Sequence, residues 1–162
     1  MTKSKKINKK QALLKAQNIC AAQEKCIYDI EQKLYQWGLP KEYFEPLITS
    51  LINDRFIDEE RYAISYVKEK FRFNKWGKVK IEFSLKQKNI PENYIQKAIN
   101  EIPLHEYNQL LEKELNKKLK SLKDTDEHTI KSKLVRFAVS KGFENGKVFD
   151  MVNSMIKKAH DD

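Results

Sequence analysis

The chain repeats one short pattern three times, and the three copies are 51 and 53 residues apart. Each copy closes a charged stretch with a turn signal and then opens an apolar stripe in the same phase. The stripes begin at Phe44, Ile95 and Val148. A period of this length predicts one supersecondary unit used three times. The turn signals that precede the stripes are Gly38-Leu39-Pro40, Asn89-Ile90-Pro91 and Gly142-Phe143-Glu144.

The repeated unit is predicted to be helical. Only four Gly and four Pro are present, whereas 34% of the residues are charged, a composition that favours helix over sheet. The stripes follow helical spacing, as in Ile95, Ala98, Ile99 and Ile102. Three such helices per unit need neighbours to cover their apolar faces. We therefore predict an all-α fold of three tandem three-helix repeats that form an elongated, curved array.

The same periodicity sets the expected boundaries. We expect a basic N-terminal tail over residues 1–15, and repeats over residues 16–57, 58–103 and 104–162. The tail is rich in lysine, and a run of like charges of this kind is typical of a solvated segment with weak affinity for nucleic acid. Its lysines are Lys3, Lys5, Lys6, Lys9 and Lys10.

Local signals place some helix ends. Asp58 is predicted to cap a helix that opens with Glu59 and Glu60, where the helix dipole favours acids. Asn89 is predicted to adopt the left-handed conformation that ends the helix before Pro91. In the third repeat we expect Asp124 to be the cap, with Glu127 three residues further on.

The net charge of +9 indicates an anionic partner, most often a nucleic acid. The charge is concentrated over residues 68–88, where eight Lys or Arg stand against two Glu, giving a local charge of +6. Phe71, Phe73 and Trp76 lie among these cations, a mixture that suits phosphates and stacked bases. The alternative is a solvated helix face whose aromatic side chains belong to the core.

The sequence predicts a protein without enzymatic activity, metal or cofactor. No nucleophile, base and orienting group occur in a recognisable pattern, and the three histidines are scattered. Cys20 and Cys26 would lie on different faces of a helix, so we expect neither a disulfide nor a metal site. Free cysteines and the absence of a long apolar run lead us to expect a cytoplasmic protein with no membrane contact.

Two segments of the second repeat resemble the bacterial RecX family. The first runs from Asp54 to Val67 and contains Asp-Arg-Phe-Ile-Asp-Glu-Glu-Arg-Tyr-Ala, and the second is Trp-Gly-Lys-Val-Lys-Ile from Trp76. The threefold organisation extends the resemblance over nearly the whole chain. Asn89 stands where the family usually has Gly, but Asn also tolerates the left-handed conformation that the turn requires.

The resemblance implies a regulator that binds the filament formed by the RecA recombinase on DNA and mainly inhibits its ATPase and strand exchange. We also expect a monomer and, at most, weak binding to single- or double-stranded DNA. The residues expected to contact the filament or DNA are Arg55, Arg61, Arg72, Lys75, Lys78, Lys80, Lys86 and Lys88. For Arg55 and Arg61 the alternative is ion pairs between units, because acids are their neighbours in the sequence.

Two other functions remain open from the sequence. The helices joined at Gly38, Asn89 and Gly142 could form a direct DNA-binding module, although their apolar stripes argue against base-specific reading. A helical-repeat scaffold for peptides is the second alternative, although two-helix repeats have shorter periods.

Overall fold

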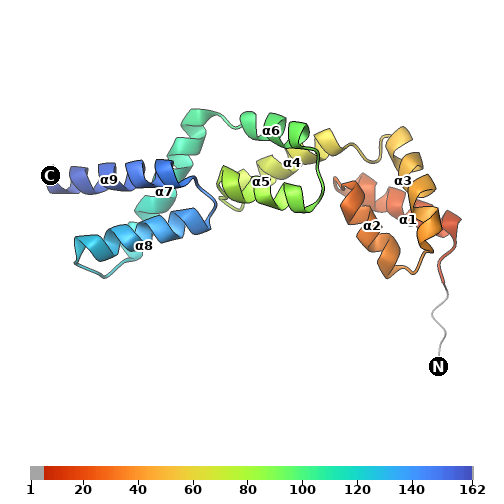
Figure 1. The fold of residues 1–162 in the computed structure, drawn as a ribbon, viewed down its shortest axis with the longest axis horizontal. Coiled ribbons are helices and arrows are strands. Elements are labelled where there is room, and N and C mark those ends of the chain that lie inside the picture. The colour runs from red at the N-terminus through yellow and green to blue at the C-terminus, as the bar shows by residue number, and fades with distance from the viewer. Residues whose placement is uncertain (1–5, 162) are drawn as a thin grey trace, which may run out of the picture. The chain divides into compact units, whose positions relative to one another are not determined.

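The computed structural model describes residues 6–161, and Lys3 and Lys5 of the expected tail lie outside this range. Over the described residues the chain forms α-helices and one short 3₁₀ helix, η1, without strands, which confirms the all-α prediction (Figure 1). The elongated, curved shape of the array stays a prediction. The elements are α1 (Lys9–Ala22), α2 (Ile27–Gln36), η1 (Lys41–Tyr43), α3 (Phe44–Asn53), α4 (Glu59–Arg72), α5 (Lys78–Gln87), α6 (Glu92–Asn100), α7 (Leu104–Ser121), α8 (Glu127–Ser140) and α9 (Asn145–Asp161).

The chain divides into two compact units that do not follow the expected repeat boundaries. The first unit runs to Ser65 and includes Leu85–Ile95, and the second combines Tyr66–Ser84 with Gln96–Asp162. The division therefore passes through α4, α5 and α6, each of which has one end in each unit.

The first helix corrects the expected N-terminal tail. Helix α1 begins at Lys9, so residues 9–15 are helical rather than part of a tail. The Asn8 side chain accepts a hydrogen bond from the Gln11 amide at 2.8 Å, and the Gln11 side chain accepts one from the Asn8 amide at 3.2 Å. This capping box fixes the start of the helix, and Ala12 and Ala16, one turn apart, are fully buried. The capping box and the two buried alanines thus favour a helix here, although the segment is rich in lysine.

The core of the first unit is built on the stripes that the sequence predicts. Ile30, Leu34 and Leu51 are fully buried, and Leu39 and Leu47 pack with them. The turns take the predicted conformations, because Gly38 has φ +74° and Asn89 has φ +59°. The cap on α4 is confirmed, since the Asp58 carboxylate accepts a hydrogen bond from the Arg61 amide at 3.0 Å.

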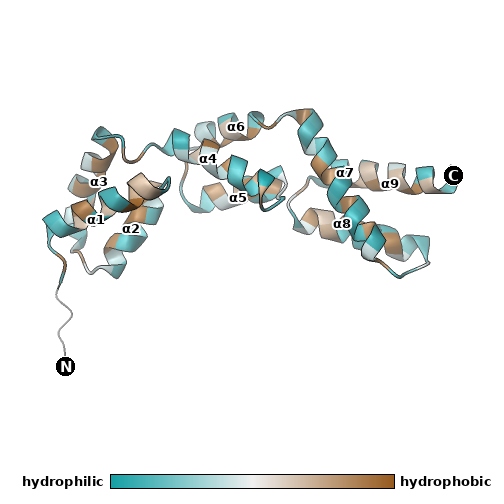
Figure 2. Ribbon diagram, turned by 180° about the vertical axis from the view of Figure 1, so that it is seen from behind, coloured by the Kyte–Doolittle hydropathy of each residue, from teal (hydrophilic) through white to brown (hydrophobic). Residues whose placement is uncertain are grey.

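In the second unit, α7, α8 and α9 pack pairwise, and apolar and polar segments alternate along them (Figure 2). Tyr107 and Phe143 are its largest buried side chains. The cap expected at Asp124 was wrong. Asp126, directly before α8, accepts the Thr129 amide at 3.0 Å. Asp124 lies too far upstream to cap and instead pairs with Lys133 at 2.7 Å.

Candidate nucleic-acid interface

The segment from Lys70 to Lys80 is a strongly basic stretch that lies within the second compact unit. It contains five cations and no acidic residue, and it runs from the last turn of α4 into the first turn of α5. The connection turns sharply because Lys75 adopts a left-handed φ of +60°. The turn is tied to α4, since the Trp76 amide donates to the Lys70 carbonyl oxygen at 3.0 Å. The cations are therefore placed by a defined turn.

The indole of Trp76 contacts two of these cations. The ammonium of Lys80 lies 4.5 Å from a ring centroid of the indole, and that of Lys70 lies 5.1 Å from it. Lys70 also lies 5.3 Å from the Tyr66 ring centroid. Cation–π contacts of this kind hold an ammonium in place while leaving its protons free for other acceptors. We call Lys70, Trp76 and Lys80 the Trp76 cluster.

The start of α5 is anchored by backbone and hydroxyl groups of the second unit. The Gly77 amide donates to the Lys141 carbonyl at 2.8 Å, and the Val79 amide donates to the Gly142 carbonyl at 2.9 Å. Between them, the Lys78 amide donates to a tyrosine hydroxyl at 3.0 Å. The first amides of a helix have no partners within the helix, so these three contacts fix its end.

That hydroxyl belongs to Tyr107, which is fully buried. Burial, and then the hydrogen bond to Glu144, raise the pKa of Tyr107, so the phenol stays neutral. Its proton is donated to the Glu144 carboxylate, and its oxygen accepts from Lys78. The Lys78 ammonium lies 4.6 Å from the Tyr107 ring centroid. The backbone amide and the side-chain ammonium of Lys78 are thus both positioned by Tyr107.

Exposed apolar side chains accompany the cations. Phe73 is 81% exposed, Phe83 61% and Val79 51%. Val79 and Phe83 were not among the residues predicted from the sequence, although their spacing of four residues, out of phase with the buried Ile81, indicates an exposed apolar face of α5.

Two aromatic side chains grouped with Phe73 in the sequence have other roles. Phe71 is buried, and its ring is stacked 6.1 Å from that of Tyr107. The alternative interpretation, an aromatic side chain of the core, therefore holds for Phe71. Trp76 is half-buried beneath its two lysines. Phe73 remains the aromatic ring of this segment that is most available for stacking.

Four of the expected binding residues lie in this segment of the second unit. Arg72 is exposed at the end of α4, and its carbonyl oxygen accepts a hydrogen bond from the Lys75 ammonium at 2.5 Å. Lys78 and Lys80 lie over Tyr107 and Trp76, as described above.

Arg61 stabilises the first unit through its side-chain contacts. The Arg61 guanidinium contacts the Glu24 carboxylate at 2.6 Å, and this hydrogen bond raises the pKa of Arg61 further. It also donates to the Arg55 carbonyl oxygen at 3.1 Å. Arg55 itself is exposed, with a left-handed φ of +60°. Arg61 therefore links the chain before α2 to the α3–α4 turn, a contact over 37 positions in sequence.

Lys88 and Lys86 also have partners within the first unit. The Lys88 ammonium donates to Asp29 at 2.9 Å and to the Tyr62 hydroxyl at 2.9 Å. Burial alone would raise the pKa of Asp29, but the hydrogen bond and charge of Lys88 outweigh it and the pKa is lowered. The ammonium of Lys86 lies 3.6 Å from a carboxylate oxygen of Glu92. These two cations are already balanced by acids, whereas segment 70–80 contains none.

The described residues offer no group of three or more His, Cys, Asp or Glu that could hold a metal ion. Cys20 and Cys26 are free thiols. Burial raises the pKa of both, that of Cys26 to about 12, so neither is a reactive thiolate at neutral pH. Across residues 6–161, no helix combines the length and apolar character needed to cross a bilayer.

Comparison with known proteins agrees with the family resemblance. A family model described as "RecX, second three-helix domain" matches residues 58–99. "Regulatory protein RecX" of Clostridium tetani (strain Massachusetts / E88) is 33% identical over 137 residues, which are 83% of this chain and 59% of that protein. "Regulatory protein RecX" of Limosilactobacillus reuteri (strain DSM 20016) is 27% identical over 79% of this chain and 48% of that protein. The chain thus spans less than two thirds of the length of these relatives.

Two solved structures share the fold. One, described as "Crystal structure of regulatory protein RecX", has a TM-score of 0.78 and 25% identity, and the match covers 90% of this chain and 73% of that one. RecX from Lactobacillus salivarius has a TM-score of 0.75 over 93% of this chain and 95% of that one. At 20% identity, this second similarity concerns the fold alone.

Proposed function

The chain belongs to the RecX family, and on this premise we propose that it regulates the RecA recombinase. The proposed mode is binding to the RecA–DNA filament, with inhibition of RecA ATPase and strand exchange as the main effect. The role is that of a binding protein without a catalytic centre or cofactor. We propose that it acts as a monomer in the cytoplasm.

The observation that supports a filament surface most directly is the acid-free segment of residues 70–80. Its turn is anchored at Gly77 and Val79, and three of its lysines lie over aromatic rings, so these cations are held in place before binding. Preorganised cations contact phosphates or acidic protein surfaces with less loss of conformational entropy than free lysines. By contrast, Arg61 and Lys88 already have carboxylate partners.

We therefore narrow the proposed contact set within the eight residues expected from the sequence. Arg72, Lys75, Lys78 and Lys80 are proposed to contact the filament directly. Arg61 and Lys88 are proposed to support the fold of the first unit, which their ion pairs with Glu24 and Asp29 stabilise. Arg55 and Lys86 are exposed, and we propose that they also contact the filament but contribute less to binding.

The test is DNA-dependent ATP hydrolysis by RecA, with the protein added at substoichiometric and equimolar ratios. We expect suppression at low ratios, because a regulator bound to a filament affects several protomers. Charge reversal at Lys75, Lys78 and Lys80 should weaken this suppression without unfolding the protein. Unchanged suppression by the triple variant would remove this segment from the mechanism.

A second candidate function is direct, largely sequence-independent DNA binding. The observation that favours it is the exposure of Phe73 and Phe83 beside the lysines, because exposed aromatic rings are stacking platforms for bases. Such binding should be sensitive to salt and indifferent to sequence. Tight binding to one short duplex and not to others would contradict this and favour a base-reading module.

A further inference from the structure

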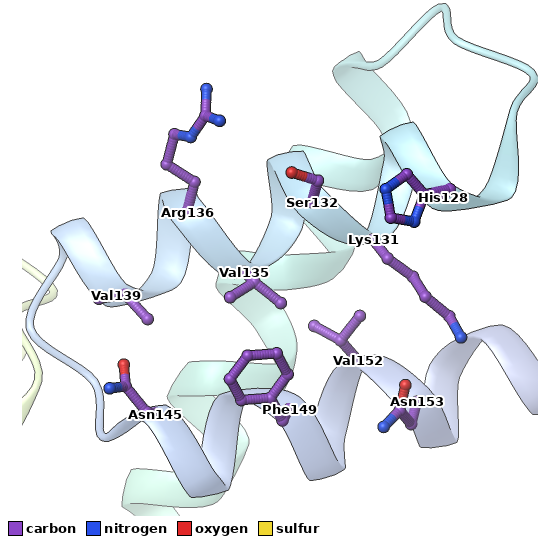
Figure 3. Close-up of a pocket in the computed structure, with 10 residues that line it drawn as sticks. All are labelled: His128, Lys131, Ser132, Val135, Arg136, Val139, Asn145, Phe149, Val152 and Asn153. Atoms are coloured by element: carbon purple, nitrogen blue, oxygen red, sulfur yellow. The ribbon is translucent and has the colours of Figure 1, made fainter.

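Helices α8 and α9 enclose a groove of about 600 Å³ that the proposed function does not use (Figure 3). Val135 and Val139 line it from α8, and Phe149 and Val152 line it from α9. In Figure 3 the Phe149 ring lies across from Val135, between the two helices. Both helices contribute apolar side chains at spacings of three or four residues, so the groove follows the helix axes.

The groove borders the core of this unit, which it meets at the buried Val152, and its other apolar side chains are partly open to solvent. Leu134 and Ala138 of α8 are buried, whereas the neighbouring Val139 is 38% exposed. Phe149 is 52% exposed on α9. Helix α7 packs against both α8 and α9, and it lies behind the pair in Figure 3. The groove is therefore an apolar face of the helix pair that remains open to solvent.

The charged residues that line the groove all carry, or can carry, positive charge. They are Lys131, Arg136 and His128, and no Asp or Glu lines it. Lys131 lies 3.5 Å from Glu127 at one end, so its charge is partly balanced. Arg136 makes no ion pair with any residue in the part of the chain that the structure describes. The rim therefore favours an anionic occupant along most of its length.

We propose that this groove binds an acidic amphipathic helix of a partner protein. The apolar floor would take one stripe of the incoming helix, and Arg136 and Lys131 would contact carboxylates on its flanks. Laying an amphipathic helix into a groove between two helices is a common mode of peptide recognition. A nucleic acid fits less well, since a phosphate backbone gains nothing from Val135, Val139 and Phe149. The inference does not depend on the proposed action on RecA.

The test uses the full chain and a synthetic probe, in the absence of RecA and DNA. The probe is a fluorescein-labelled acidic peptide of about 15 residues, with leucines on one helical stripe and glutamates on its flanks. A scrambled peptide of the same composition, which lacks the stripe, is the control probe. Fluorescence anisotropy should show saturable binding of the first peptide and much weaker binding of the second.

Variants locate the binding site. Phe149→Ser and Arg136→Glu should each weaken peptide binding about tenfold, because truncating a central apolar anchor or reversing a facing charge removes a main contact. Both side chains are exposed, so the fold should survive, which circular dichroism checks. The matched controls are Leu104→Ser, also strongly exposed at 60%, and Lys117→Glu. Both lie on α7 outside the groove, and neither should change the affinity.

Three results would overturn the proposal. One is the absence of saturable binding by the acidic peptide, and another is equal binding by the scrambled peptide. The third is displacement of the peptide by a labelled oligothymidine whose own binding is lost in Phe149→Ser, which would assign the groove to nucleic acid. None of these measurements involves RecA, so failure here leaves the proposed function standing, and failure of the ATPase test leaves this proposal standing.

Discussion

The backbones of Gly77 and Gly142 approach so closely that no side chain fits between them. A Cβ on Gly77 would lie 2.3 Å from the carbonyl carbon of Gly142, and one on Gly142 would lie 2.3 Å from the Cβ of Lys80. The approach lets Val79 donate to the Gly142 carbonyl and fixes the first turn of α5. The position of segment 70–80 therefore depends on two glycines in different parts of the sequence.

Gly77→Ala should destabilise the protein by about 2–3 kcal/mol, because backbone atoms must move to admit the methyl group. Urea unfolding measures the change. Gly146→Ala is the matched control, since a Cβ there meets nothing within 4 Å and the residue is in α9. It should leave stability unchanged or slightly higher. Equal stability of the two variants would contradict the close approach.

Glu59 should make the stability of the first unit depend on pH. Burial, followed by the charges of Asp29 and Glu31, raises the pKa of Glu59 from 4.5 to about 7. Between these values the folded protein binds more protons than the unfolded chain, so stability falls as pH rises through this window and levels off above it. Unfolding by urea at about pH 5 and about pH 8 brackets the effect.

Glu59→Gln should remove this dependence and make the protein more stable than the wild type at the higher pH, because no charge is then buried. Glu60→Gln, which makes the same change of side chain at the adjacent acid on α4, is the matched control. The assignment of the effect to Glu59 fails if the two variants give pH profiles parallel to that of the wild type.

Arg61→Ala should act on stability and not on binding. The substitution removes the ion pair with Glu24 and the hydrogen bond to the Arg55 carbonyl, at a cost of about 1 kcal/mol for a partly exposed group. At temperatures where the variant is folded, its effect on RecA ATPase should equal that of the wild type. A loss of inhibition without a change in unfolding midpoint would instead place Arg61 on the binding surface.

Substitution of two phenylalanines that lie two residues apart in the sequence should have different effects, one on binding and the other on stability. Phe73→Ser should leave the unfolding midpoint unchanged and weaken binding to the filament or DNA, since its ring is 81% exposed. Phe71→Ser removes a buried ring that stacks on Tyr107 and should cost about 3–5 kcal/mol. Thermal unfolding and DNA-binding anisotropy separate the two. Similar stability losses in both variants would contradict the assigned exposures.

The sequence predicts what is decided by local geometry. Asn89 and Gly142 were expected in turns because few other residues tolerate a positive φ, and Asp58 was expected to cap α4 because its side chain needs to reach only three residues. The sequence analysis assigned the cap of α8 to Asp124 instead of Asp126 because two aspartates precede the helix, and the choice between them depends on where the helix starts.

Long-range relationships could not be predicted in this way. The acids beside Arg55 and Arg61 in the sequence indicate ion pairs as the alternative for these two arginines. Nothing in the pattern, however, indicates that Arg61 meets Glu24 or that Lys88 meets Asp29. The role of Tyr107, which receives the Lys78 amide from 29 positions away, likewise depends on tertiary packing. The structure therefore narrows the proposed site by showing which charges are already balanced.

The most direct test of the proposed function is the RecA ATPase titration with the wild type beside the Lys75→Glu, Lys78→Glu, Lys80→Glu triple variant. A second triple variant, Lys117→Glu, Lys120→Glu, Lys123→Glu, makes the same change in net charge outside the segment. The proposal predicts suppression at substoichiometric ratios by the wild type and the second variant, and a clear loss with the first. Absence of suppression by the wild type, together with binding to naked DNA, would contradict it and leave direct DNA binding as the function.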